Sequence, residues 1–209
     1  MAVTIKRAGV SDAAIVALLG RLTFQETFSA LFLQHEHELK QYLDKTFCVA
    51  KIEASIGKAQ NRYWTASVDG LPVGYGKLKF PSKNPARKAD APAQLQKIYV
   101  LSDFISQNVG HKLMDEIWAE GARLAIDEMW LNVLSSNERA IRFYERHGWM
   151  RTGETTFDIG SQSFHFLTLS ASLVPNPTPH PNPNAPPPTD TRPAIPQTPL
   201  PATPALPAL

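Results

Sequence analysis

The sequence has little cysteine, little net charge and no long apolar run. Its single cysteine, Cys48, excludes an intrachain disulfide framework and any zinc or iron–sulfur site made of several cysteines. Its 21 basic and 19 acidic residues are mixed along the chain, so the net charge of +2 does not support a nucleic-acid-binding surface. No apolar stretch approaches the roughly 20 residues of a membrane helix, and Ser11 and Asp12 favour a capped helix over a signal peptide. We therefore expect a cytoplasmic protein that binds neither nucleic acid nor a membrane.

Proline is scarce in most of the chain and dominates its C-terminal part. Fourteen of the 18 prolines lie from Pro175 onward, and residues 174–209 contain only two charged side chains, Asp190 and Arg192. Proline cannot donate a backbone hydrogen bond, and a segment of this composition has few side chains to pack. We expect a disordered or polyproline-like, proline-rich tail at residues 174–209, acting as a spacer or an unselected extension, and a folded domain at residues 1–173.

Helical spacing of apolar residues recurs along the folded part. Ile15, Leu18, Leu19 and Leu22 follow the caps Ser11 and Asp12 and predict the buried face of a first helix. Further helices are expected near residues 39–43, 52–57, 113–124 and 137–147.

Runs of β-branched and aromatic residues predict strands between these helices. Asp69-Gly70 and residues 160–163 are typical of hairpin turns. A strand, a helix and a second strand follow one another over residues 95–134, and such a unit pairs its strands in parallel. We expect an α/β fold with a mixed, mostly antiparallel sheet of six or seven strands flanked by helices. The predicted strands are 3–5, 63–68, 73–80, 95–101, 129–134, 155–159 and 164–169.

The segment from Ile98 to Met114 suggests an anion site. A strand there leads through a polar loop into a helix, whose first amides lack intrahelical partners at the positive end of the helix dipole. Gly110 would let a phosphate approach the backbone, and Asn108 tolerates a left-handed conformation better than other non-glycine residues. On these residues alone, an ordinary strand–helix turn remains the alternative.

A second informative segment runs from Asn137 to Gly148. Asn137 occupies a helix N-cap position, and Ala140 and Tyr144 follow it on the same helical face. Tyr144 is either a core packing residue or a proton donor whose hydroxyl points into a cleft.

The second segment resembles a signature of the GNAT N-acetyltransferases, which transfer acetyl from acetyl-CoA to an amine. The family pattern is Asn-x-x-Ala-x-x-Phe-Tyr-x-x-x-Gly-Phe. The matching residues are Asn137, Ala140, Phe143, Tyr144 and Gly148, with Trp149 in place of the last Phe.

The first segment resembles the other family signature, Gln/Arg-x-x-Gly-x-Gly/Ala before an amphipathic helix. Gly110 falls on the last small residue, whereas Asn108 replaces the first Gly and Ile105 replaces Gln/Arg. Residues 21–28 and 97–100 look most like the branch of bacterial spermidine/spermine (diamine) acetyltransferases.

The resemblance implies acetyl-CoA as cosubstrate and no metal. Strand backbone would hold the pantetheine arm, loop amides would cradle the pyrophosphate, Asn137 would bond the pantetheine, and Tyr144 would protonate the leaving thiolate. The residues implied in cofactor binding are Ile98, Tyr99, Val100, Ile105, Ser106, Gln107, Asn108, Val109, Gly110, His111, Asn137, Ala140 and Tyr144.

A protonated amine must lose a proton before it attacks a thioester. Glu26 is the first candidate for this base, because it lies in the segment that covers the acceptor in this family. The alternatives are Glu36, Glu38 and Asp44. Direct attack needs no covalent enzyme intermediate, so Cys48 is expected to be a buried small apolar residue. The His-Glu-His-Glu run at 35–38 does not have the spacing of a metal site.

The expected function is therefore acetyl transfer to the primary amine of a small molecule such as a polyamine. Two alternatives remain open. One is a protein or peptide N-acetyltransferase, and the other is a catalytically silent acyl-CoA-binding module that works through its proline-rich tail. The resemblance also allows a homodimer.

Overall fold

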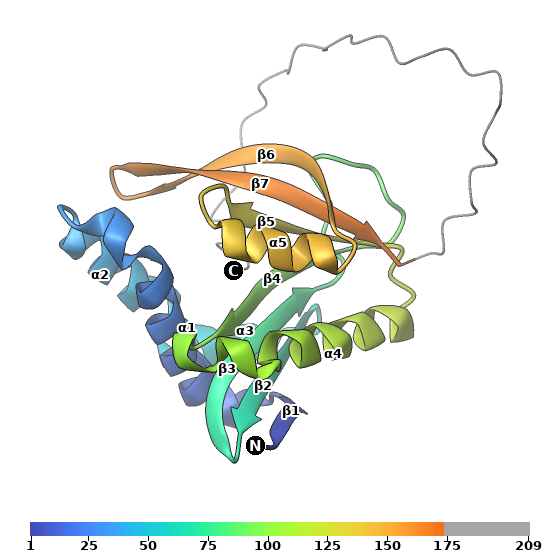
Figure 1. Ribbon diagram of the computed structural model, residues 1–209, viewed down its shortest axis with the longest axis horizontal. Coiled ribbons are helices and arrows are strands. Elements are labelled where there is room, and N and C mark those ends of the chain that lie inside the picture. Colours follow the sequence, from blue (N-terminus) through green and yellow to red (C-terminus); the bar gives the residue numbers. More distant parts are fainter. Residues whose placement is uncertain (174–209) are drawn as a thin grey trace, which may run out of the picture.

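The computed structural model describes residues 1–173, so the predicted proline-rich tail at 174–209 lies outside the described residues. Seven strands form one sheet in the order β1-β2-β3-β4-β5-β7-β6 (Figure 1). Neighbouring strands are antiparallel except β4 and β5, which are parallel, as the crossover unit predicted. The strands are β1 (Val3–Arg7), β2 (Asn61–Val68), β3 (Leu71–Lys79), β4 (Pro92–Val100), β5 (Glu128–Leu134), β6 (Met150–Ile159) and β7 (Gln162–Ser172).

Helices cover both faces of the sheet and divide the core into two clusters. On one face, α4 and α5 bury Leu113, Ile117 and Tyr144 against the strands. On the other face, α1, α2 and α3 bury Phe24 and Leu43 against a second set of strand residues. The helices are α1 (Ala13–Phe28), α2 (Glu36–Thr46), α3 (Val49–Ile56), α4 (Val109–Arg123) and α5 (Glu138–Arg146), with 3-10 helices η1 (Val10–Asp12), η2 (Ser29–Phe32) and η3 (Ser102–Gln107).

The strands are longer than predicted at several ends. β4 begins at Pro92, inside the region expected to be a loop, and β6 begins at Met150. Pro92 can start a strand because the first residue does not need to donate to the ladder. The last hairpin turns tightly at Gly160, whose φ of 61° is left-handed.

The predicted buried face of α1 is wrong. Ile15, Leu18 and Leu22 are exposed to 38%, 57% and 40%, and of the predicted set only Leu19 is buried. The buried face instead carries Phe24 and Phe28 together with Gly20. At Gly20 the packing is close, because a Cβ there would lie 2.4 Å from the Phe47 ring, just after α2.

Two further observations in the same N-terminal region bear on the sequence analysis. The helical stretch Val10–Phe32 is long and apolar enough to cross a membrane by length and composition, although 44% of its most apolar window is buried inside the protein. A core helix passes the same test, and Phe24 and Phe28 pack in the second cluster. The expectation of a buried Cys48 is wrong: the residue is exposed at the N-cap position of α3, where its side chain makes no capping hydrogen bond.

Candidate active site

The parallel ladder between β4 and β5 is short. It pairs Pro92 with Glu128, Ala93 with Met129 and Gln94 with Trp130, and then ends. Both strands continue, β4 beside β3 and β5 beside β7. Residues 95–100 and 131–134 therefore share no ladder, and Figure 1 shows the two strands diverging. Strand backbone without a neighbour in mid-sheet can pair with an extended ligand.

The segment after β4 forms the predicted anion site in a modified shape. η3 replaces the expected tight loop, and its own 3-10 bonding engages amides such as those of Ser106 and Gln107. Asn108 then adopts the left-handed conformation, with φ of 64°, and α4 begins at Val109.

The first turn of α4 supplies unbonded amides. The Lys112 amide donates to the Asn108 carbonyl at 3.2 Å, so the amides of Val109, Gly110 and His111 precede the helical ladder. A Cβ on Gly110 would meet only the Phe143 ring, at 3.5 Å. The backbone here can therefore be approached by a phosphate group.

A pair of histidines links the start of α4 to the end of α5. His147 Nδ1 lies 2.7 Å from the Phe143 carbonyl oxygen, which can only accept, so Nδ1 carries the proton. His147 Nε2 then accepts from His111 Nδ1 at 2.9 Å. Burial and the charge of His147 lower the pKa of His111. This contact joins the start of α4 to the end of α5, the two segments that carry predicted cofactor-binding residues.

The α5 segment has the geometry that its sequence predicted. The Asn137 side-chain oxygen accepts from the Ala140 amide at 3.0 Å and caps the helix. Tyr144 is fully buried, and its hydroxyl has no hydrogen-bond partner within residues 1–173. Burial, and secondly Tyr99, raise the pKa of Tyr144 well above its usual value. A buried, protonated and unpartnered hydroxyl is costly unless a ligand accepts from it.

Glu26 on α1 and Glu38 on α2 each accept hydrogen bonds from the backbone amide and the hydroxyl of one serine. Glu26 accepts from the Ser102 amide at 3.0 Å and from its hydroxyl at 3.1 Å. Glu38 accepts from the Ser161 amide and hydroxyl, both at 2.9 Å, and the backbone bond lowers the pKa of Glu38. These carboxylates tie α1 to the end of β4 and α2 to the β6–β7 turn.

The remaining base candidates lie on the surface of α2. Asp44 pairs with Arg21 at 2.8 Å and with Lys40, and Glu36 is exposed. Among residues 1–173, no three His, Cys, Asp or Glu side chains are grouped to hold a metal ion.

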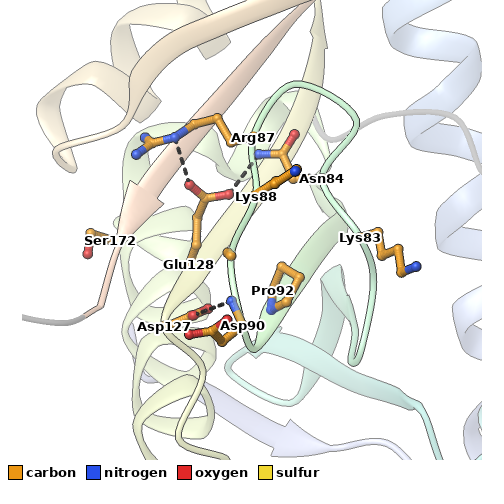
Figure 2. Close-up of a pocket in the computed structure, with 10 residues that line it drawn as sticks. Lys83, Asn84, Arg87, Lys88, Asp90, Pro92, Asp127, Glu128 and Ser172 are labelled. Atoms are coloured by element: carbon orange, nitrogen blue, oxygen red, sulfur yellow. Dashed lines mark hydrogen bonds and ion pairs between the residues drawn. The ribbon is translucent and has the colours of Figure 1, made fainter.

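A separate pocket of about 690 Å³ lies where β4 and β5 still pair (Figure 2). Several of its polar groups bind one another: Arg87 lies 3.2 Å from Glu128, Asn84 donates to Glu128 at 2.8 Å, and Asp127 accepts from the Asp90 amide at 2.8 Å. These contacts hold the loop before β4 against the start of β5. Because the pocket's polar groups already serve this structural role, the separated parts of β4 and β5 remain the candidate site. The lining residues are Lys83, Asn84, Arg87, Lys88, Ala89, Asp90, Pro92, Asp127, Glu128 and Ser172.

Comparison with known proteins agrees with this geometry. Residues 23–149 match the model of the acetyltransferase (GNAT) family. The chain belongs to the GNAT family. It is 25% identical over 156 residues to an uncharacterised N-acetyltransferase of Lactobacillus delbrueckii subsp. lactis, covering 75% of this chain and 89% of that protein. It is 29% identical over 126 residues to an uncharacterised N-acetyltransferase of Mycobacterium bovis, covering 60% and 76%. The enzyme class is thus N-acetyltransferase.

Solved GNAT structures share the fold at low identity. The PaiA N-acetyltransferase of Thermoplasma acidophilum, in complex with coenzyme A, superposes with a TM-score of 0.62 at 17% identity, covering 82% of this chain and 99% of that one. The ribosomal-protein-S18-alanine N-acetyltransferase of Escherichia coli gives 0.58 at 16% identity, covering 82% and 94%. The spermidine/spermine branch remains a prediction.

Sequence reasoning missed one buried and one half-buried lysine in the sheet. Lys97 is 5% exposed on β4, and Lys77 lies opposite it on β3. The signal was present in the run Gln94–Val100, where a charged residue interrupts a strand that is buried along its whole length.

Proposed function

We propose that the protein transfers the acetyl group of acetyl-CoA to the primary amine of a small molecule. The observation that carries this proposal is the divergence of β4 and β5 between an anion-binding helix start and the unpartnered hydroxyl of Tyr144. The coenzyme A complex of the Thermoplasma protein, which has the same fold, supports the choice of cosubstrate.

The residues present fit such a cosubstrate. The amides of Val109, Gly110 and His111 would bind the pyrophosphate. The β4 edge that faces away from β3 would bind the pantetheine amides as an added strand. Tyr144 would donate to the sulfur, since burial keeps its hydroxyl protonated.

The reaction is direct nucleophilic attack on the thioester carbonyl. The C–N bond forms, the C–S bond breaks, and the amine loses one proton while the departing thiolate receives a hydrogen bond or proton from Tyr144. The amine must arrive neutral although its usual pKa is about 10.4. Glu26 stays the predicted base. Its carboxylate also accepts hydrogen bonds from Ser102, two residues after the end of β4, where β4 and β5 have separated.

Two measurements test this proposal. Calorimetry with coenzyme A should show binding of the purified full-length chain, and no heat of binding would overturn the proposal. A thiol-reactive dye should then report release of free coenzyme A with small amines, polyamines and peptides as acceptors. Release with peptides alone would favour the protein-directed alternative. Binding without any release would favour the silent module.

A further inference from the structure

Two histidines form a hydrogen-bonded pair beside the proposed phosphate site. We call His111 and His147 the histidine pair. His147 Nδ1 donates to the Phe143 carbonyl at 2.7 Å, and His147 Nε2 lies 2.9 Å from His111 Nδ1. The ring centres are 4.7 Å apart, and the Phe143 ring contacts both, at 5.3 Å for His111 and 4.4 Å for His147. Three of the four ring nitrogens are therefore engaged, and both rings are held in place.

The fourth nitrogen, His111 Nε2, is the open end of the pair. His111 is exposed, and in the described part of the chain its Nε2 makes no hydrogen bond or ion pair. The two nitrogens of an imidazole point to different sides of the ring, so Nε2 points away from His147. This nitrogen is therefore accessible to a ligand.

The open end belongs to the first turn of α4. The amide of His111 is one of three, with those of Val109 and Gly110, that precede the helical ladder. The Phe143 ring that packs against both imidazoles also lies beside Gly110, where an added Cβ would be 3.5 Å from it. An anion bound by these amides thus lies within a side-chain length of the His111 ring.

The histidine pair can take up one proton without losing its internal contacts. With two protons, one lies on His147 Nδ1 and the other between the two rings. A third proton can be added only at His111 Nε2, and the proton between the rings can then lie on either nitrogen. The positive charge is shared, so the pair titrates as one unit. Protonation turns the open end from an acceptor into a charged donor.

The protein's own groups mostly oppose this proton. Burial, and then the charges of His147 and Arg146 on α5, lower the pKa of His111, whereas Asp115 on α4 acts in the opposite direction. The positive end of the α4 dipole acts in the same sense as Arg146. The neighbouring Lys112 directs its Nζ to a carbonyl of β1 at 3.2 Å. An anion at the start of α4 would reverse this balance, because it attracts the charge that these groups repel.

We propose that the histidine pair is a proton-linked ligand of coenzyme A: His111 Nε2 donates to a phosphate oxygen, and the pair takes up one proton from solvent when the cosubstrate binds. This inference rests on the proposed function and deepens it, since it adds a side chain and a pH dependence to the backbone amides. The pyrophosphate and the 3′-phosphate of coenzyme A share the chemistry of this contact, and the experiment separates them.

Calorimetry of coenzyme A binding to the full-length protein tests the proton uptake. Titrations at pH 7 in two buffers with different ionisation enthalpies count the protons, and we expect a net uptake of up to about one proton per bound molecule. The affinity should fall as pH rises, because the bound pair keeps its proton to a higher pH than the free pair. The 3′-phosphate itself titrates at about pH 6, so each result is taken as the difference between wild type and variant.

Two variants separate the charge from the proton uptake. His111→Gln keeps only a neutral donor. The wild type should bind coenzyme A roughly 10- to 100-fold more tightly than this variant at pH 5.5, the scale of one hydrogen bond to a charged group, and about equally at pH 8.5. His111→Lys carries a charge throughout this range, since the usual pKa of lysine is about 10.4. It should bind more tightly than His111→Gln at pH 8.5, without proton uptake.

Two further comparisons complete the experiment. His165→Gln removes an exposed histidine of β7, away from α4, and is the control that should keep the proton uptake of the wild type. Dephospho-coenzyme A lacks the 3′-phosphate. Uptake that persists with it assigns the contact to the pyrophosphate, and uptake that disappears assigns the contact to the 3′-phosphate. Circular dichroism verifies that each variant folds.

Two outcomes overturn the inference. One is equal proton uptake by the wild type and a folded His111→Gln protein. The other is a loss of affinity in His111→Gln that is the same at pH 5.5 and pH 8.5. In both cases coenzyme A still binds to the wild type, so the proposed function stands. A wild type that binds no coenzyme A at any of these pH values contradicts the proposed function and this inference together.

Discussion

Tyr144→Phe isolates the contribution of one hydroxyl at the candidate site. Phenylalanine keeps the ring contacts with Phe143 and Trp149, whose centres lie 5.4 Å and 5.8 Å away. Only the hydroxyl is lost, and it has no partner within residues 1–173. The variant therefore separates a role in chemistry from a role in packing.

The magnitude follows from the charge that develops on sulfur. The thiolate of a thiol with an ordinary pKa of about 8.5 is a weaker base than a phenolate, so Tyr144 acts mainly by a hydrogen bond to the forming thiolate. A hydrogen bond to a charged group is worth about 1.5–3 kcal/mol. We expect kcat to fall by roughly 10- to 150-fold, while the coenzyme A dissociation constant changes little.

The stability of Tyr144→Phe should move in the opposite direction. Removing a buried donor without a partner relieves a penalty of about 1–3 kcal/mol, so the melting temperature should stay constant or rise by several degrees. Thiol release measured with saturating acceptor gives kcat, and calorimetry gives the cofactor affinity. Unchanged kcat would remove Tyr144 from the leaving-group role, and a lower melting temperature would show that its hydroxyl has a structural partner.

Three further predictions concern other parts of the site. Lys77→Met should stabilise the fold at pH 7 by up to about 3 kcal/mol. The Lys77 ammonium keeps its proton only below about pH 8 in the folded protein, whereas in the unfolded chain it keeps the proton up to the usual pKa of 10.5. The gain should therefore vanish above pH 10.5 in urea unfolding, and a gain that is independent of pH would contradict the assignment. Asn108→Gly should preserve coenzyme A affinity, whereas Asn108→Val should cost about 1–2 kcal/mol of stability because φ there is positive; equal melting temperatures for both would refute this. If the carboxylate of Glu26 acts by holding Ser102, Glu26→Gln and Ser102→Ala should reduce kcat by similar factors; a far larger loss for Glu26→Gln would favour the base role.

Local rules explain what the sequence could predict. The N-cap at Asn137 and the left-handed Asn108 depend on residues within one or two turns, and both follow from the chemistry of asparagine. The parallel pairing of β4 with β5 follows from the crossover that a strand–helix–strand unit makes. Rules for short segments and for single connections were enough in these cases.

Contacts between distant segments explain what could not be predicted. Glu26 and Ser102 are 76 positions apart, and no sequence pattern near either residue predicts the hydrogen bonds between them. The packed face of α1 depends on Phe47 fitting against Gly20, which a hydrophobic stripe cannot reveal. Periodicity identifies that a helix is amphipathic, but close packing decides which side it presents.

A β-bulge in β4 connects the opening of the sheet with the position of the buried lysine. Lys77 pairs with Lys97 and Leu78 with Leu95, so Gln96 is an extra residue in β4. It lies just beyond Gln94, the last residue of β4 that pairs with β5. A bulge bends its strand and shifts the alternation of side chains by one position. The bend favours separation from β5, and the shift turns Lys97 toward α1–α3. One inserted residue thus contributes both to the separation of β4 from β5 and to the burial of Lys97 beside Phe47 and Tyr99.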